Sequence, residues 1–108
     1  MAFIARSLLI VTMLISCKFA FADGSTSGKV NLLQFWKDHP GVLVGLETMS
    51  DPDNCGRSDW YVVPDAHEHY KEIYALLLAA NVSGQKVLVW VRGCENGFPK
   101  VANAMIIR

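Results

Sequence analysis

The chain lacks an excess of charge of either sign, a long apolar run and more than a few cysteines. Its 108 residues contain ten Lys and Arg, ten Asp and Glu, and three Cys. A balanced charge excludes the basic surface with which proteins bind nucleic acids or anionic membranes. The apolar run near the N-terminus is shorter than the roughly 20 residues that a spanning helix needs. These absences predict a small protein that neither binds nucleic acid nor spans a membrane.

The first 22 residues are typical of a secretory signal peptide. A cation at Arg6 precedes the apolar run from Ser7 to Cys17, and Ala20-Phe21-Ala22 provides the small residues of a cleavage site. We therefore expect a secreted or periplasmic protein that starts at Asp23. An alternative is a lipoprotein, because Leu14-Ile15-Ser16-Cys17 is similar to a lipobox in which Cys17 is acylated.

The mature chain is short, mildly acidic and left with two cysteines. Cleavage leaves 108 − 22 = 86 residues and removes Arg6 and Lys18, so the net charge becomes (10 − 2) − 10 = −2. A domain of this size has a small core and often needs a covalent link. An exported protein keeps cysteines oxidised, so we expect a disulfide between Cys55 and Cys94 across 94 − 55 = 39 residues. Two free buried thiols are the alternative.

Five strands and one helix are predicted within a single domain, residues 23–108. The residues before the first strand, Asp23 to Gly28, are polar and rich in glycine, and we expect them to be a flexible lead-in. Five strands with a helix between the third and fourth is the order of the OB-fold, a partly open five-stranded barrel. A ferredoxin-like domain instead needs a helix after its first strand, where this chain has a turn. The strands are expected over Lys29–Trp36, Val42–Met49, Asp59–Val63, Lys86–Arg92 and Val101–Ile107, the last alternating around Val101, Met105 and Ile107.

The predicted helix follows Pro64 and has two apolar faces. Asp65 is expected to cap it with help from Glu68, and Gly84 to end it. The core face contains Tyr70, Ile73, Tyr74, Leu77 and Asn81. A second face at Ala75, Leu76 and Ala79 predicts a contact with a neighbouring subunit. The alternative is that these residues are good helix formers left partly exposed.

The stretch Tyr70 to Cys94 resembles the binding subunits of pertussis-like and subtilase-type bacterial toxins and their short exported relatives. The resemblance depends on a helix that ends in YALLLAANVSGQKV, a following strand that ends in Gly93-Cys94, and an upstream Asn54-Cys55 step. It implies an OB-fold, a homo-oligomeric ring of five that can carry a catalytic toxin chain, and binding of host-type glycans or glycoproteins, often sialylated. It covers nearly all of the mature chain.

The resemblance also implies a candidate glycan site. The arrangement D-G-x-x-S-G of the subtilase-type sialic-acid pocket matches Asp23 to Gly28, which assigns sugar contacts to Asp23 and Ser27. A tyrosine of that family falls on Val91 here, with Arg92 beside it as the candidate polar group. The departure at Val91 puts the same sugar specificity in doubt, and a polar N-terminal linker remains an alternative for Asp23 to Gly28.

The sequence predicts neither an enzyme nor a cofactor or metal site. His67 and His69 are two residues apart, which on a helix turns them to nearly opposite sides. Ser58 and Ser83 lack a nucleophile motif. We therefore expect a non-enzymatic module that binds a glycan. The alternative is a stand-alone periplasmic protein, structural or inhibitory, that binds another protein through its barrel or helix.

Overall fold

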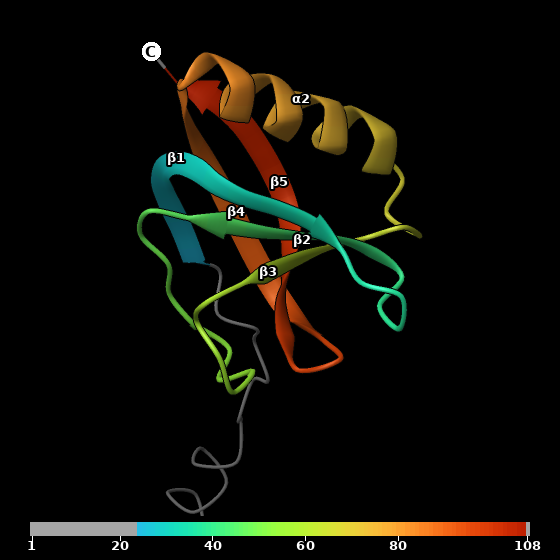
Figure 1. Cartoon of the computed structure of the whole chain (residues 1–108). Helices are drawn as coiled ribbons and strands as arrows, with labels where there is room; N and C mark the ends of the chain where they lie inside the picture. Colours follow the sequence, from blue (N-terminus) through green and yellow to red (C-terminus); the bar gives the residue numbers. More distant parts are fainter. Residues whose placement is uncertain (1–23, 108) are drawn as a thin grey trace, which may run out of the picture.

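A computed structural model describes residues 24–107 (Figure 1). The predicted signal peptide, residues 1–22, lies outside the described residues with Cys17 and Asp23. The fold is mainly β with one helix between the third and fourth strands, as the sequence predicts. The elements are β1 (Gly24–Phe35), β2 (Gly41–Leu46), β3 (Tyr61–Pro64), α2 (Tyr70–Ser83), β4 (Lys86–Glu95) and β5 (Phe98–Ile107).

The five strands close into a ring in the order β1-β2-β3-β5-β4. β1 has two neighbours, because its first half pairs with β4 and its second half, after a register shift between Val30 and Leu32, pairs with β2. A shift of this kind bends a strand. β3 and β5 run parallel and pair only at Val62 and Lys100. α2 packs against β1, β3 and β5 across one end of the ring (Figure 1).

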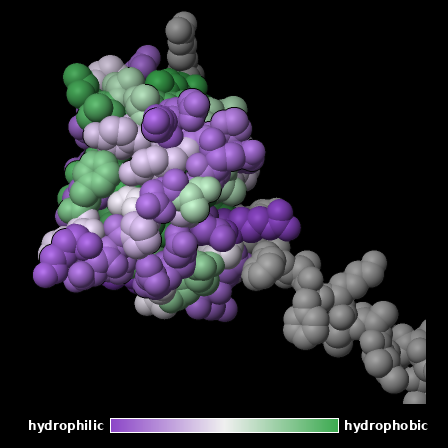
Figure 2. Space-filling view, turned by 90° about the vertical axis from the view of Figure 1, so that its right-hand side faces the viewer, coloured by the Kyte–Doolittle hydropathy of each residue, from purple (hydrophilic) through white to green (hydrophobic). Residues whose placement is uncertain are grey.

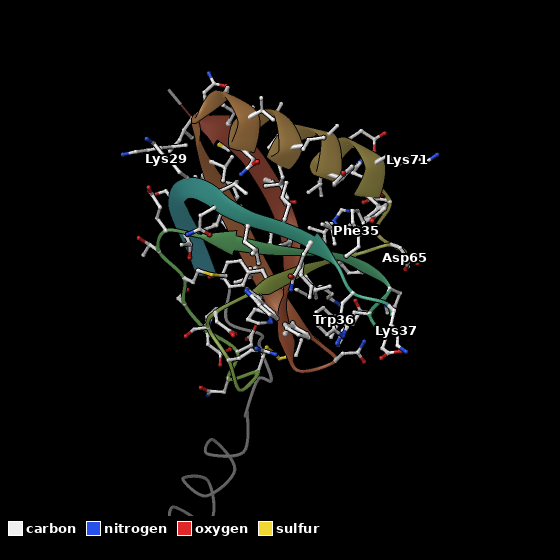
Figure 3. All side chains as sticks on the ribbon, viewed as in Figure 1. Lys29, Phe35, Trp36, Lys37, Asp65 and Lys71 are labelled. Carbon is white, nitrogen blue, oxygen red and sulfur yellow. A yellow bond between two sulfur atoms is a disulfide. The ribbon has the colours of Figure 1, made fainter. Side chains whose placement is uncertain are left out.

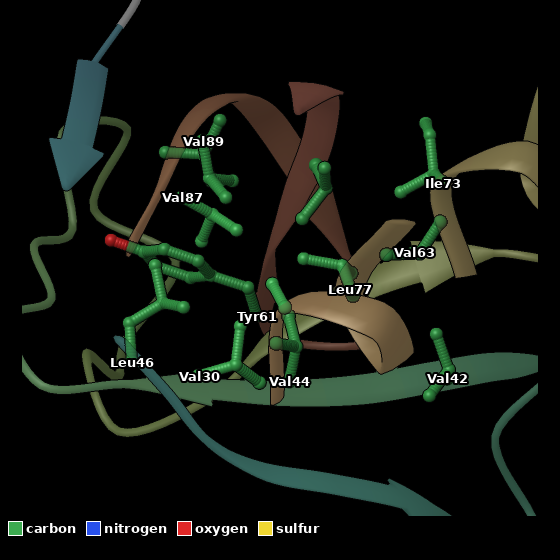
Figure 4. Packing of buried hydrophobic residues seen from close by; sticks show 13 residues of the cluster. Val30, Val42, Val44, Leu46, Tyr61, Val63, Ile73, Leu77, Val87 and Val89 are labelled. Atoms are coloured by element: carbon green, nitrogen blue, oxygen red, sulfur yellow. The ribbon is translucent and has the colours of Figure 1, made fainter. Parts of the chain in front are cut away.

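The interior of the ring is filled by branched aliphatic side chains that alternate along the strands. α2 contributes Ile73 and Leu77 from the face predicted to be buried and also Ala80, which was predicted to lie outside that face. Asn81 on the flank of α2 donates a hydrogen bond of 2.9 Å to the Val30 carbonyl. Figure 4 shows Leu77 and Ile73 of α2 beside the strand residues of this cluster. The strand residues include Val30, Val42, Val44, Leu46, Val63, Val87, Val89, Val91 and Val101.

Tyr61 is the largest fully buried side chain, and its hydroxyl group is completely used. It accepts a hydrogen bond of 2.8 Å from the Ser50 N–H and donates one of 3.0 Å to the Ser50 carbonyl. The hydroxyl of buried Thr26 lies 3.2 Å away. The Tyr61 hydroxyl therefore links Ser50, in the loop after β2, to Thr26 of β1. Its buried oxygen atom has hydrogen-bond partners for both its donor and its acceptor capacity.

The predicted disulfide between Cys55 and Cys94 is confirmed. The two Cα atoms are 5.5 Å apart, and the bond joins the loop before β3 to the end of β4. Two aspartates order the same loop: Asp51 accepts hydrogen bonds from the N–H groups of Cys55 and Gly56, and Asp53 accepts one of 2.7 Å from the Gly93 N–H. The loop is thus held to β4 by the hydrogen bond between the Asp53 carboxylate and the Gly93 N–H as well as by the covalent bond.

The prediction of a flexible lead-in is wrong for Gly24 to Gly28. These residues form the first half of β1 and pair with β4, from Gly24 opposite Val91 to Gly28 opposite Val87. Thr26 is buried between them. Composition misleads here because main-chain hydrogen bonds to β4 order a segment that has few apolar side chains to bury.

The predicted helix cap is also wrong. The N-cap is His69, four residues after the predicted N-cap Asp65, and its side chain makes no capping hydrogen bond. The reason is that Pro64 still belongs to β3, so the chain turns first, with the His67 N–H bonded to the Pro64 carbonyl. The end of the helix is as predicted, since Gly84 has the left-handed φ of 72° that glycine adopts without strain.

The predicted alternation of the last strand is wrong beyond Val101. Trp90 pairs with Asn103 whereas Val91 pairs with Val101, so β5 has one extra residue, Ala102. This bulge reverses the sides to which the following side chains point. Ala104 and Ile106 pack on the core in consequence, and Met105 is 44% exposed.

Loss of the disulfide should cost a large part of the stability. Closing 39 residues is worth about 4 kcal/mol on the chain-entropy model. We expect the Cys55→Ser/Cys94→Ser variant to lose about that amount in urea unfolding monitored by tryptophan fluorescence. The wild type in reductant should match the variant, and unchanged unfolding midpoints in both would contradict the prediction.

Neighbouring leucines of α2 should respond very differently to truncation. Leu77 is 0% exposed and Leu78 is 42% exposed. Leu77→Ala should cost about 2–5 kcal/mol because it leaves a cavity in the core. Leu78→Ala, measured in the same urea titration at low protein concentration, serves as the control and should cost less than about 1 kcal/mol. Equal losses would mean that α2 is rotated relative to this description.

Candidate functional site

A groove of about 560 Å³ lies between the first half of α2 and the outer face of β4 and β5. The alternation of β4 puts Val89 and Val91 in the core and turns Trp90 outward, where it is half-buried. Asn103 lies opposite Trp90 on β5, on the same outer face. Glu72 and Leu76 of α2 form the other wall. The groove therefore combines one large aromatic ring with an amide and a carboxylate.

A second hollow of about 540 Å³ adjoins the groove. It is lined by two cationic side chains, Arg92 and Lys100, and by Gly93, against which the Lys100 side chain lies. His67 and Ala102 line both depressions. The two depressions are therefore adjacent: the groove contains the indole of Trp90 and the carboxylate of Glu72, and the hollow contains the positive charges of Arg92 and Lys100.

His67 fixes the boundary between the groove and the hollow. Its Nε2–H donates a hydrogen bond of 2.9 Å to the carbonyl of Ala102, the bulge residue of β5, and its Nδ1 accepts one of 2.9 Å from the His69 N–H. The acceptor role of Nδ1 assigns the proton to Nε2. This imidazole joins the turn before α2 to β5, and so it sets the distance between the two walls of the groove.

The predicted sugar contacts do not come together. Ser27 is exposed on β1 and lies opposite Leu88, whereas Arg92 is four residues further along β4, about 13 Å away at the rise of a β-strand. Asp23 lies outside the described residues. Arg92 lines the hollow, so of the three predicted residues it is the one that the structure places at this site.

The three residues of α2 predicted to form an interface do not lie on one face of the helix. Ala75 and Ala79 are exposed on the outward side of the helix. Leu76 is half-buried, packs on the core and lines the groove. Leu78 and Val82, with 42% and 79% of their surface exposed, are the large apolar residues of α2 on this outward side.

The remaining large aromatic side chains are less suited to a ligand. Phe98 is buried, and the Arg57 guanidinium lies 4.5 Å from its ring centroid and 5.1 Å from that of Trp60. Arg57 also donates two hydrogen bonds to Asp59, which lower the pKa of that carboxyl group. Arg57 thus covers these rings, while Trp36 is 54% exposed next to the β1–β2 turn and lines neither the groove nor the hollow.

Sequence reasoning missed Glu72, Lys100 and Asn103. Glu72 is an ordinary first-turn helix residue by pattern, and Asn103 faces Trp90 only because of the bulge at Ala102. The proximity of Lys100 to Gly93 likewise depends on the irregular pairing of β4 with β5. Only the outward position of Trp90 was available from the alternation of Val87, Val89 and Val91.

Within residues 24–107 no three His, Cys, Asp or Glu side chains are grouped so that they could hold a metal ion. None of the helices in the same range has the length and apolar character required to cross a membrane. Comparison of the whole chain with protein-family models, with curated proteins and with solved structures finds no significant match.

Removal of the His67 imidazole should loosen the groove. His67→Ala breaks the hydrogen bonds to Ala102 and His69, and we expect a loss of about 1–2 kcal/mol of unfolding free energy in urea. His69→Ala is the matched control, because the His69 N–H belongs to the main chain and remains able to bond His67. An equal loss in both variants would contradict the assigned role of His67.

Proposed function

We propose that this protein is an exported, non-enzymatic binding module with an OB-type barrel, whose ligand is a glycan. Support for the barrel type comes from the strand order β1-β2-β3-β5-β4 and from the position of α2 between β3 and β4. Support for export comes from the N-terminal sequence and from the disulfide, which an oxidising compartment favours. The resemblance to toxin binding subunits is consistent with both.

The groove at Trp90 is the observation that carries the glycan proposal. Binding sites for small molecules are concave and mostly apolar, with a few polar groups that fix orientation. A sugar ring has an apolar face that can lie on an indole and hydroxyl groups that need donors and acceptors. Trp90 offers the flat surface, Asn103 offers both a donor and an acceptor, and Glu72 offers an acceptor.

The adjoining hollow favours a glycan that has an acidic group. Lys100 and Arg92 bring positive charge to one end of the groove, and an ammonium or guanidinium group binds a carboxylate strongly when water is partly excluded. A sialylated glycan on a host-type glycoprotein satisfies both parts of the surface. Display of several such sites by a homo-oligomer would raise the apparent affinity for the glycan. The family resemblance implies a further partner, a catalytic toxin chain.

Protein binding is the second candidate. Phe35 and Trp36, with 60% and 54% of their surface exposed, stand next to each other at the β1–β2 turn. Figure 3 shows Phe35 beside the first half of α2, and its ring makes an edge contact with Tyr74 at 5.5 Å. Exposed neighbouring aromatic residues are typical of protein interfaces, so this surface favours a structural or inhibitory role.

Truncation of Trp90 should weaken glycan binding. We expect the wild type to bind a subset of an immobilised glycan array, and Trp90→Ala to lose at least about tenfold in affinity for the best ligand by titration calorimetry, equivalent to about 1.4 kcal/mol. Trp36→Ala is the control, because it removes an equally large aromatic side chain outside the groove. Unfolding in urea verifies that both variants are folded.

Two further substitutions test whether the glycan is acidic and which of the two candidate sites binds it. Lys100→Ala should weaken binding of acidic glycans and leave neutral ones unchanged. Ser27→Ala should reduce binding only if the site implied by the family resemblance, at Asp23 and Ser27, is the one in use. Failure of the wild type to bind any glycan on the array would refute the glycan proposal and leave protein binding.

A further inference from the structure

The groove beside α2 follows the edge of β5 as well as its outer face. It is lined by four consecutive residues of this strand, Ala102 to Met105. Successive side chains of a strand point to opposite faces of the sheet. Ala104 packs on the core whereas Asn103 and Met105 are exposed, yet all three line the groove. Residues of both faces border one groove where the main chain itself forms part of its wall.

This edge of β5 lacks a strand partner among residues 24–107. β4 pairs with the other side of β5, and β3 reaches β5 at one position, Val62 opposite Lys100. Further along, His67 donates its hydrogen bond to the Ala102 carbonyl, and the described residues make no other hydrogen bond to the main chain of this edge as far as Ile107. The edge therefore presents N–H and C=O groups that no other part of the described chain uses.

The usual protection of a strand edge is missing here. Natural sheets blunt an edge with charged residues or proline, with a bulge, or with a covering helix or loop. From Val101 to Ile107 there is neither a charged residue nor a proline. The bulge at Ala102 lies at the start of this stretch, and α2 is separated from the edge by the groove of about 560 Å³. The edge is thus open to pairing.

The α2 wall of the groove belongs to the more apolar end of the molecule. Figure 2 shows hydrophobic side chains gathered at the end where α2 lies, above a largely hydrophilic flank. Leu76 on this wall is half-buried, and Met105 on β5 is 44% exposed. A segment that pairs with β5 would therefore bury apolar surface in addition to forming main-chain hydrogen bonds.

We propose that the edge of β5 binds an extended, uncharged polypeptide segment of a partner protein, which adds to the sheet between β5 and α2. An extended main chain supplies donors and acceptors at the spacing that an open edge requires. The six residues from Ala102 to Ile107 are about 20 Å long, enough to pair with a segment of similar length. The lack of charge on the edge and the Glu72 carboxylate on the α2 wall favour a segment without acidic residues. The inference goes beyond the glycan proposal and does not depend on it, because the contacts are made by main-chain groups.

The first experiment selects a ligand for the edge. The probe is a phage-displayed library of random linear octapeptides, selected on the immobilised mature protein. The enriched peptides should be rich in β-branched residues and poor in Asp and Glu. The best of them is synthesised and titrated by calorimetry. A library from which no peptide is enriched, or only acidic ones, would overturn the inference.

The second experiment tests whether main-chain groups of the peptide make the contact. Two versions of the selected peptide are N-methylated, one at odd and one at even positions. Only every second amide of an added strand bonds the neighbouring edge. One version should therefore lose at least about tenfold in affinity, while the other stays within about twofold of the parent peptide. Equal effects in both versions would contradict strand addition.

The third experiment fills the groove from its helix wall. Glu72→Trp places a bulky side chain there and should weaken peptide binding by at least about tenfold. Lys71→Trp is the matched control, because Lys71 is exposed in the same turn of α2 and does not line the groove. Urea unfolding verifies that both variants are folded. Equal affinities of the two variants would place the peptide elsewhere and refute the inference.

The fourth experiment locates the bound peptide by hydrogen–deuterium exchange followed by NMR. Amides between Ala102 and Ile107 that point away from β4 should exchange more slowly in the complex, and those of Lys37 and Asp38 at the β1–β2 turn should not change. Unchanged exchange along β5 would overturn the inference. Protection of the same amides by self-association without peptide, detected by sedimentation velocity, would overturn it too, because the occupant would be a second copy.

Glycan binding is measured on the same samples, so that the two proposals fail separately. Peptide binding at β5 without glycan binding would refute the proposed function alone. Glycan binding without peptide binding would refute this inference alone.

Discussion

The short junction between β3 and β5 is the constraint on which the rest of the structure depends. β3 has only four residues, and it meets β5 at one pair, Val62 and Lys100. Within residues 24–107, a ring closed at a single position leaves the rest of the β5 edge without a strand partner on that side. α2 packs across one end of the ring, against both β3 and β5, and covers the interior with Ile73, Leu77 and Ala80. The helix therefore completes a core that the sheet alone does not enclose.

The position of α2 also creates the surfaces that the proposals use. Its inner side closes the core, its flank at Glu72 and Leu76 forms one wall of the groove opposite Trp90, and its outward side remains apolar. His67 couples the first two, because it bonds the turn before α2 to the bulge of β5. A change in the placement of one helix would thus alter core, groove and outward face together.

The elements of the fold were largely predictable, whereas the candidate site was not. Alternation of Val87, Val89 and Val91 and the helical spacing of Ile73 and Leu77 report burial directly, because each period matches one kind of secondary structure. The cap expected at Asp65 failed because β3 extends through Pro64, and capping patterns do not indicate where a preceding strand ends. The prediction of a flexible lead-in failed for Gly24 to Gly28 because these residues are ordered by main-chain pairing with β4, which is distant in sequence.

By itself the sequence determined the five strands, the helix and its glycine end, and the pairing of the two cysteines that remain after residue 22. These features depend on local periodicity, on backbone freedom at Gly84 and on the presence of two cysteines after residue 22, all of which the linear order contains. Only the tertiary structure decided which side of β5 faces outward after Ala102 and that Trp90, Asn103 and Glu72 share a groove. The physical reason is that one extra residue in a strand reverses every side chain after it, and its position is set by the strands that pair with it.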